Sequence, residues 1–226
     1  MYLPGIIKKQ PGTNFECMYQ LANIFVLIIF TLHLNFPAYA NDRKEAAHLV
    51  NTINTTTDTL GKLEDAVSRH LNKLLMMAKS HNNYQPGSKD VDSLEYYYEK
   101  LISFYDRTTI KATELKGAGS SVKLKNHFLR LLKNGKAPWV KIIPAFLKGF
   151  RNGWPSLNQS EQNRIDSAGP IFRQANELTE QLLIIISEQK DILIKQFGLQ
   201  YADGVYSSNW YPQRPGSCRM GQLPVV

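Results

Sequence analysis

Few residues in this 226-residue chain could do chemistry, and the best-spaced pair is Glu45 and His48. A Glu-x-x-His step places a carboxylate and an imidazole on one helical face, as in bundles that hold two iron ions. Such a site needs a second Glu-x-x-His and two further glutamates, and the sequence does not supply that set. We therefore expect a solvated helical face, with no metal site and no cofactor.

Three other features of the sequence could take part in chemistry. His70 falls on a predicted helix seam, where a hydrogen-bonded core histidine is expected rather than a ligand. His127 lies in a basic segment and could make its charge pH-dependent, because imidazole titrates near neutral pH. Residues 117–121 precede a helix but lack the spacing and the Lys-Ser/Thr of a phosphate loop, so a helix stop is the simpler interpretation. No hydrolase or metalloprotease motif is found, and we do not expect an enzyme.

The first 40 residues predict an export signal rather than part of the fold. They combine a basic start, an apolar stretch over residues 21–34, a helix-breaking Pro37 and the small-x-small triplet Ala38-Tyr39-Ala40. The apolar stretch is short and contains polar residues, which disfavours a membrane span. We predict cleavage after Ala40 and a periplasmic or extracellular location, with an uncleaved anchor as the alternative.

Helical periodicity dominates the chain after the signal. Apolar residues recur at steps of three and four over residues 42–82, and again from Ser88 or Asp90 to residue 117, as in coiled coils. Residues 81–88 form a turn cluster, so these two helices should pair as an antiparallel hairpin. The seam positions are Ala46, Leu49, Ile53, Thr56, Leu60, Leu63, Val67, His70, Leu74 and Met77, followed by Val91, Leu94, Tyr98, Leu101, Tyr105, Thr108, Ala112 and Leu115.

The second half is less regular. A short helix is predicted over residues 122–133, followed by Asn134-Gly135 and a segment interrupted by prolines 138, 144 and 155. A long helix should begin near residue 160, restart at Gly169-Pro170 and end at residue 198. Residues 182–186 are apolar all round, which predicts the central helix of a bundle.

The predicted fold class is all-α: an elongated antiparallel helical bundle over residues 41–200. It has three long heptad-patterned helices plus short basic amphipathic helices in the subregion 116–155. Residues 201–226 form an irregular tail rich in Pro, Gly and Tyr, and this tail contains Cys218.

The positive charge has one location. The net charge is +8, yet no Asp or Glu lies between Glu114 and Glu161, whereas the rest of the chain after residue 40 holds slightly more acids than bases. We expect this basic segment to bind an anionic partner or surface. Its nine cations are Lys116, Lys123, Lys125, Arg130, Lys133, Lys136, Lys141, Lys148 and Arg151.

The same segment carries an apolar helical face, formed by Trp139, Ile142, Ile143, Phe146, Leu147 and Phe150. This face either packs on the bundle or inserts into a membrane, and packing is favoured because apolar helical stripes are mostly core.

The leading hypothesis is an exported, non-catalytic binding protein whose segment 116–151 engages an acidic protein, an anionic lipid or an envelope polymer. The alternative is a membrane-active, pore-forming or toxin-like protein that inserts residues 139–150. Nucleic acid is not expected as a partner, because no recognised nucleic-acid-binding motif occurs. Residues 96–98 are three consecutive tyrosines, so at least one ring should lie outside the core, and a homodimer is possible.

Overall fold

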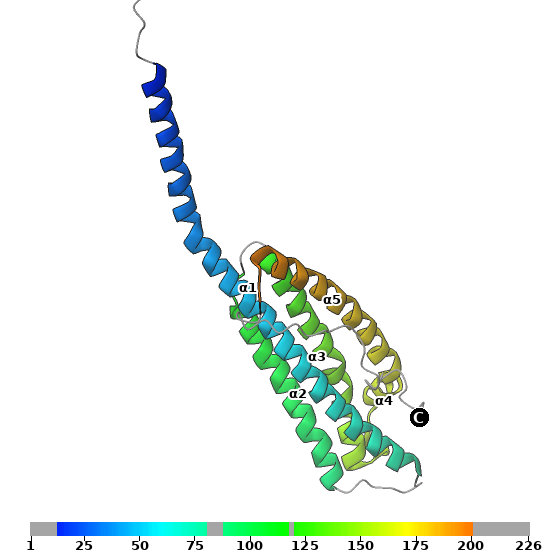
Figure 1. Ribbon diagram of the computed structural model, residues 1–226. Coiled ribbons are helices and arrows are strands. Elements are labelled where there is room, and N and C mark those ends of the chain that lie inside the picture. Colours follow the sequence, from blue (N-terminus) through cyan, green and yellow to red (C-terminus); the bar gives the residue numbers. More distant parts are fainter. Residues whose placement is uncertain (1–12, 81–87, 118–119, 201–226) are drawn as a thin grey trace, which may run out of the picture. The chain divides into compact units, whose positions relative to one another are not determined.

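A computed structural model describes residues 13–80, 88–117 and 120–200, and every regular element within them is helical (Figure 1). The all-α prediction is thus confirmed for this part of the chain. The predicted tail, with Cys218, and most of the 81–88 turn lie outside the described residues. The elements are α1 (Thr13–Ser80), α2 (Ser88–Glu114), α3 (Ser120–Asn152), the short 3-10 helix η1 (Trp154–Ser156), α4 (Gln159–Asp166) and α5 (Ala168–Phe197).

The chain divides into two compact units between Arg43 and Lys44. In the first unit α1 continues through Pro37, so the predicted break at this proline is wrong. An interior proline removes one backbone hydrogen bond and its ring crowds the carbonyl four residues earlier, yet α1 is helical on both sides of Pro37. Among the described residues, no helix combines the length and the apolar character needed to cross a membrane.

In the second unit, α1 and α2 pair in opposite directions. Tyr105 on α2 reaches Glu64 on α1, and Asp90, earlier on α2, reaches Lys73, later on α1. This order of contacts is that of an antiparallel pair. The buried seam residues are Ala46, Leu49, Ile53, Thr56, Leu60, Val67 and Leu74 on α1, and Val91, Leu94, Leu101, Tyr105, Thr108 and Ala112 on α2.

Threonines in the first half of this α1 segment do not interrupt the helix. The hydroxyl of Thr57 donates to the backbone carbonyl of Ile53 at 2.8 Å, and that of Thr59 donates to Thr55 at 2.9 Å. Such bonds to the preceding turn satisfy a hydroxyl inside a helix. Nearby, the Nζ of Lys190 donates to the side-chain oxygen of the buried Asn54, which connects α5 to α1.

The short helix predicted over 122–133 is wrong in its length, because α3 runs unbroken through Gly135, Pro138 and Pro144 to Asn152. An interior proline costs about 3 kcal/mol in a helix, and a glycine about 1 kcal/mol. The buried face of α3 continues across all three positions at steps of three and four, and its burial offsets this cost. That face comprises Leu124, Phe128, Leu131, Leu132, Trp139, Ile142, Ile143, Phe146, Leu147 and Phe150.

The restart expected at Gly169-Pro170 falls slightly earlier, at Ser167, which separates α4 from α5. α5 ends at Gly198, whose left-handed backbone (φ 57°, ψ 42°) is a conformation that glycine adopts without strain. The predicted central position of this helix is wrong. Leu182 and Ile186 are buried, but Ile184 between them is 46% exposed, so α5 has an outer face.

Candidate binding surface

Four of the nine predicted cations are engaged inside the molecule, and Lys125 is the first of them. Its ammonium donates to the backbone carbonyls of Thr113 at 2.7 Å and Leu115 at 2.5 Å. The last carbonyls of a helix have no partner within the helix and carry the negative end of its dipole. Lys125 on α3 therefore caps the C-terminal end of α2.

Lys136 and Arg151 tie the outer edge of α3 to α2. Lys136 forms an ion pair with Asp106, and the guanidinium of Arg151 reaches Asp92 at 2.9 Å and Glu95 at 2.5 Å. All these groups are substantially exposed to solvent, so each pair contributes little to stability. Their main effect is to neutralise two of the nine cations.

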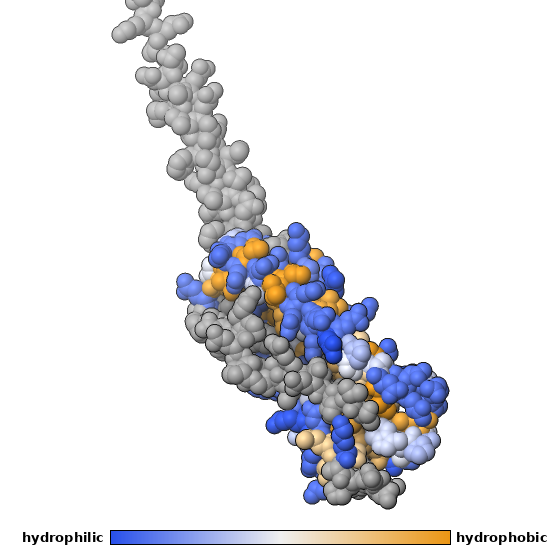
Figure 2. Space-filling view, turned by 90° about the vertical axis from the view of Figure 1, so that its right-hand side faces the viewer, coloured by the Kyte–Doolittle hydropathy of each residue, from blue (hydrophilic) through white to orange (hydrophobic). Residues whose placement is uncertain are grey.

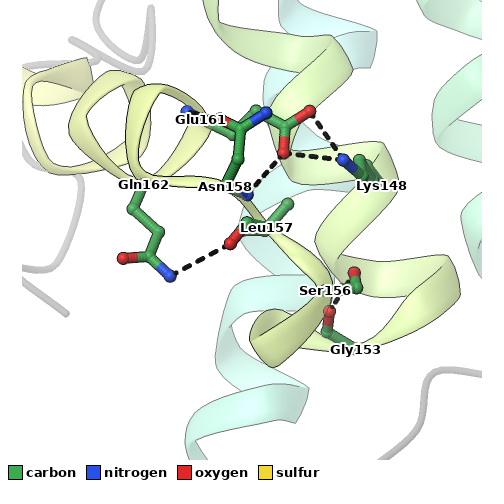
Figure 3. Close-up of polar contacts among 7 residues, drawn as sticks. All are labelled: Lys148, Gly153, Ser156, Leu157, Asn158, Glu161 and Gln162. Carbon is green, nitrogen blue, oxygen red and sulfur yellow. Dashed lines mark hydrogen bonds and ion pairs between the residues drawn. The ribbon is translucent and has the colours of Figure 1, made fainter.

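Lys148 connects α3 to the start of α4 (Figure 3). Its ammonium donates to both carboxylate oxygens of Glu161, at 2.7 and 2.8 Å. The same carboxylate accepts the backbone N–H of Asn158 at 2.8 Å, while the side-chain oxygen of Asn158 accepts the N–H of Glu161 at 2.9 Å. This capping box begins α4, and the bond from Lys148 is the main cause that lowers the pKa of Glu161.

Five cations remain exposed and form no ion pair within the part of the chain that the structure describes. Lys116 lies between α2 and α3, and the other four lie on the outer face of α3. We call these four the α3 stripe: Lys123, Arg130, Lys133 and Lys141.

The α3 stripe is a row along one side of the helix. Its members follow one another at steps of seven, three and eight residues, which keeps them within about a quarter of the helix circumference. At 1.5 Å per residue the row is about 27 Å long. No acidic residue occurs anywhere in α3. The stripe is therefore a continuous cationic surface with no internal counter-charge on its own helix.

The apolar face predicted for packing or insertion is buried: Trp139, Ile142, Ile143, Phe146, Leu147 and Phe150 are at most 8% exposed. The ring of Trp139 packs edge-on against Phe172 of α5, with centroids 5.0 Å apart. In this structure the face belongs to the core. Insertion of the segment into a membrane would require α3 to leave the bundle.

A polar junction that the sequence analysis missed lies on the inner side of α3. The carboxylate of Glu64 on α1 accepts hydrogen bonds from the Tyr105 hydroxyl at 2.5 Å and from the Trp139 indole N–H at 3.3 Å. Burial raises the pKa of Glu64, and burial also raises the pKa of Tyr105 well above 10. Glu64 follows the seam residue Leu60 by four residues. This spacing was the sequence signal that could have identified Glu64 as a buried residue.

Gly135 makes room for this junction. A Cβ atom at this position would collide with the Tyr105 hydroxyl, because the phenol lies directly on the α3 backbone. The glycine that the sequence analysis placed beyond the end of a short helix is therefore a packing residue. Three helices meet here, and the close approach of α2 to α3 depends on the missing side chain.

The other candidate residues are not brought together into a reactive site. Among the described residues, no group of three His, Cys, Asp or Glu side chains is placed to hold a metal ion. His70 stacks on Tyr97 of α2 with ring centroids 4.9 Å apart, and burial lowers its pKa. His127 is half-buried, and its Nδ1 has no hydrogen-bond partner in the described chain. His48 is exposed on α1.

Comparison of the chain with family models, with curated proteins and with solved structures gives no match.

Proposed function

We propose that this is an exported, non-catalytic helical binding protein that engages an anionic partner through the α3 stripe. The observation that carries the proposal is the row of four exposed cations on a helix without a single acid. Protein surfaces usually intersperse charges of both signs, and a large field of one sign steers ligands of the opposite sign. The partner is an acidic protein, an anionic lipid surface or an anionic envelope polymer.

The export part of the proposal rests on the sequence, and the division of the chain supports it. The apolar stretch and the small-x-small triplet at residues 38–40 precede the boundary between Arg43 and Lys44 by a few residues. Buried core residues begin at Ala46. Cleavage after Ala40 would thus remove none of the described core.

The number of free cations sets the expected strength of binding. A cation near an anionic leaflet contributes about 1 kcal/mol, and salt screens this attraction over about 10 Å at 0.1 M. The four stripe residues can therefore hold the protein on an anionic surface at low salt and release it at high salt. The paired cations Lys136, Lys148 and Arg151 should add little, because each is already neutralised.

Co-sedimentation of the purified protein with phosphatidylglycerol vesicles, alongside binding to poly-glutamate, tests the proposal. We expect binding at 50 mM NaCl and its loss at 500 mM NaCl. Replacing all four stripe residues with Gln should abolish binding to both probes. The matched control replaces four exposed cations elsewhere, Lys44, Lys111, Arg173 and Lys195, with Gln and has the same net charge.

The control should bind nearly as the wild type does. Equal loss in both variants would show that net charge, rather than the stripe, causes binding, and would overturn the proposal. Dye release from the vesicles separates surface binding from insertion. No release is expected, since the apolar face of α3 is buried. Release that Phe146→Asp abolishes would favour the membrane-active alternative instead.

A further inference from the structure

The outer face of α5 carries three exposed acids. Glu180, Glu188 and Asp191 are all exposed and form no ion pair with any described residue. Ile184 lies between them and is 46% exposed. Figure 2 views the molecule from the side on which α5 lies in Figure 1, and hydrophobic residues are visible there among hydrophilic ones. We call these four residues the α5 acidic face.

The α5 acidic face repeats, in the reverse direction, the spacing of the part of α3 from Arg130 to Lys141, which contains three of the four stripe residues. Upward along α3, Arg130, Lys133, the small exposed Ala137 and Lys141 follow at steps of three, four and four residues. Downward along α5, Asp191, Glu188, Ile184 and Glu180 follow at the same three steps. Because both elements are α-helices with the same rise per residue, equal steps give equal axial distances and equal rotations.

If two helices lie antiparallel with these faces in contact, the four positions of α3 lie opposite the four positions of α5. Three cations would each meet a carboxylate, and the apolar Ile184 would lie over the small Ala137. Within one molecule this match is not made, since none of the six charged residues has an ion pair among the described residues. Complementary charge rows of this kind guide the choice of partner and the register of an interface.

We propose that the partner of the α3 stripe is a second copy of this chain, which docks its α5 acidic face antiparallel onto the stripe. This inference rests on the proposed function, because it needs the same unengaged cations. It adds that a soluble polyanion and the second copy compete for one surface. A contact over about three turns of each helix is small by the standards of stable interfaces, so the association is weak and strongly salt-dependent.

A mixing experiment tests the proposal. Variant A carries Lys133→Glu and Lys141→Glu, and variant B carries Glu180→Lys and Glu188→Lys. Each variant alone presents like charges on both faces, so each should be monomeric. In an equimolar mixture the stripe of A opposes the α5 face of B, and the stripe of B opposes that of A. Charge complementarity is thus restored only on mixing.

The readout is the weight-average mass from sedimentation equilibrium at 50 mM and 500 mM NaCl. We expect the weight-average mass of the wild type and of the A–B mixture to rise with protein concentration from the monomer mass toward twice that mass at low salt, and to return to the monomer mass at high salt. A control variant with Glu99→Lys and Glu114→Lys, two exposed acids of α2, should associate as the wild type does. Circular dichroism verifies that every variant is folded.

A mixture that stays monomeric while the wild type associates would overturn this inference. A wild type that is monomeric throughout yet still binds poly-glutamate through the stripe would also overturn it, while leaving the proposed function intact. If charge reversal prevents folding, the neutral pairs Lys133→Gln with Lys141→Gln, and Glu180→Gln with Glu188→Gln, serve instead. Each should then lose association at low salt, and retained association in either would contradict the proposal.

Discussion

The two faces of α3 differ in both polarity and charge. The inner face is apolar and holds one indole N–H, which donates to Glu64. The outer face carries four cations with no acid on the same helix. Residues three or four apart on the helix thus belong to one face, while neighbours in sequence, such as Trp139 and Lys141, belong to different ones. One helix can therefore contribute its inner face to the core and its outer face to the proposed binding surface.

The largest expected effect comes from a substitution that disrupts packing on the inner face of α3. Trp139→Ala should lower the free energy of unfolding by about 3–5 kcal/mol, as truncation of a buried aromatic residue does. The ring loses its packing on Phe172 and its hydrogen bond to Glu64. Urea denaturation measures the change. The control is Val140→Ala, because Val140 follows Trp139 in sequence but is exposed. This substitution should change the free energy of unfolding by less than about 0.5 kcal/mol.

Gly135→Ala should lower stability by about 1–3 kcal/mol, the usual cost of overpacking. The new methyl group meets the hydroxyl of Tyr105, so α2 and α3 must separate slightly. A double-mutant cycle with Tyr105→Phe checks the cause, because that substitution removes the oxygen. The two changes together should cost less than their separate costs combined. Additive costs would show that the collision with Tyr105 is not the source.

Glu64→Gln should make the free energy of unfolding less sensitive to pH. Burial raises the folded-state pKa of Glu64, so its stabilising contribution is complete below the unfolded pKa of 4.5 and is lost as the pH rises through the raised pKa. Glutamine keeps an oxygen that can accept from Tyr105 and Trp139 but does not titrate.

The stability of Glu64→Gln relative to wild type should therefore increase from pH 4 to pH 7. Urea denaturation at a series of pH values gives the slope, with the exposed Glu99→Gln as control. A difference that does not vary with pH would show that the carboxylate is solvated in the folded protein.

The smallest effects distinguish a paired cation from a free one. Lys136 pairs with Asp106, while Lys133, one turn away, is unpaired among the described residues. Lys136→Gln should cost about 0.2–1 kcal/mol of stability, typical of an exposed pair, and Lys133→Gln nearly nothing. Binding to phosphatidylglycerol vesicles should show the reverse order, with a loss of up to about fivefold for Lys133→Gln. Equal effects of Lys133→Gln and Lys136→Gln on binding would contradict the division of the cations into unpaired and paired ones.

The periodicity of the sequence was sufficient to predict α1 and α2 after residue 44, because their seams are regular over many turns. It was insufficient for α3, where local rules for Gly135 and Pro138 favour a break but tertiary burial of the apolar face decides. The location of the charge could be counted from the sequence. Which cations remain free could not, since Arg151 finds its acids on α2, more than 50 residues away.

The central position predicted for residues 182–186 failed for a related reason. An apolar run shows that a helix can be buried, but it does not show how many neighbours will cover it. Among the described residues, no neighbour buries the outer side of Ile184, although Leu182 and Ile186 are each only 2% exposed. This residual exposure is what the second-copy proposal uses, and no count of residue types could have located it.

The two prolines inside α3 also have a consequence for amide hydrogen exchange. Neither Pro138 nor Pro144 carries an amide hydrogen, so the carbonyls four residues earlier, at Asn134 and Val140, lose their usual donor. Backbone opening at these points breaks fewer bonds than elsewhere in the helix. Protection from exchange along α3 should therefore fall into segments, with the turns beside each proline opening most often, although one unbroken helix carries the entire α3 stripe.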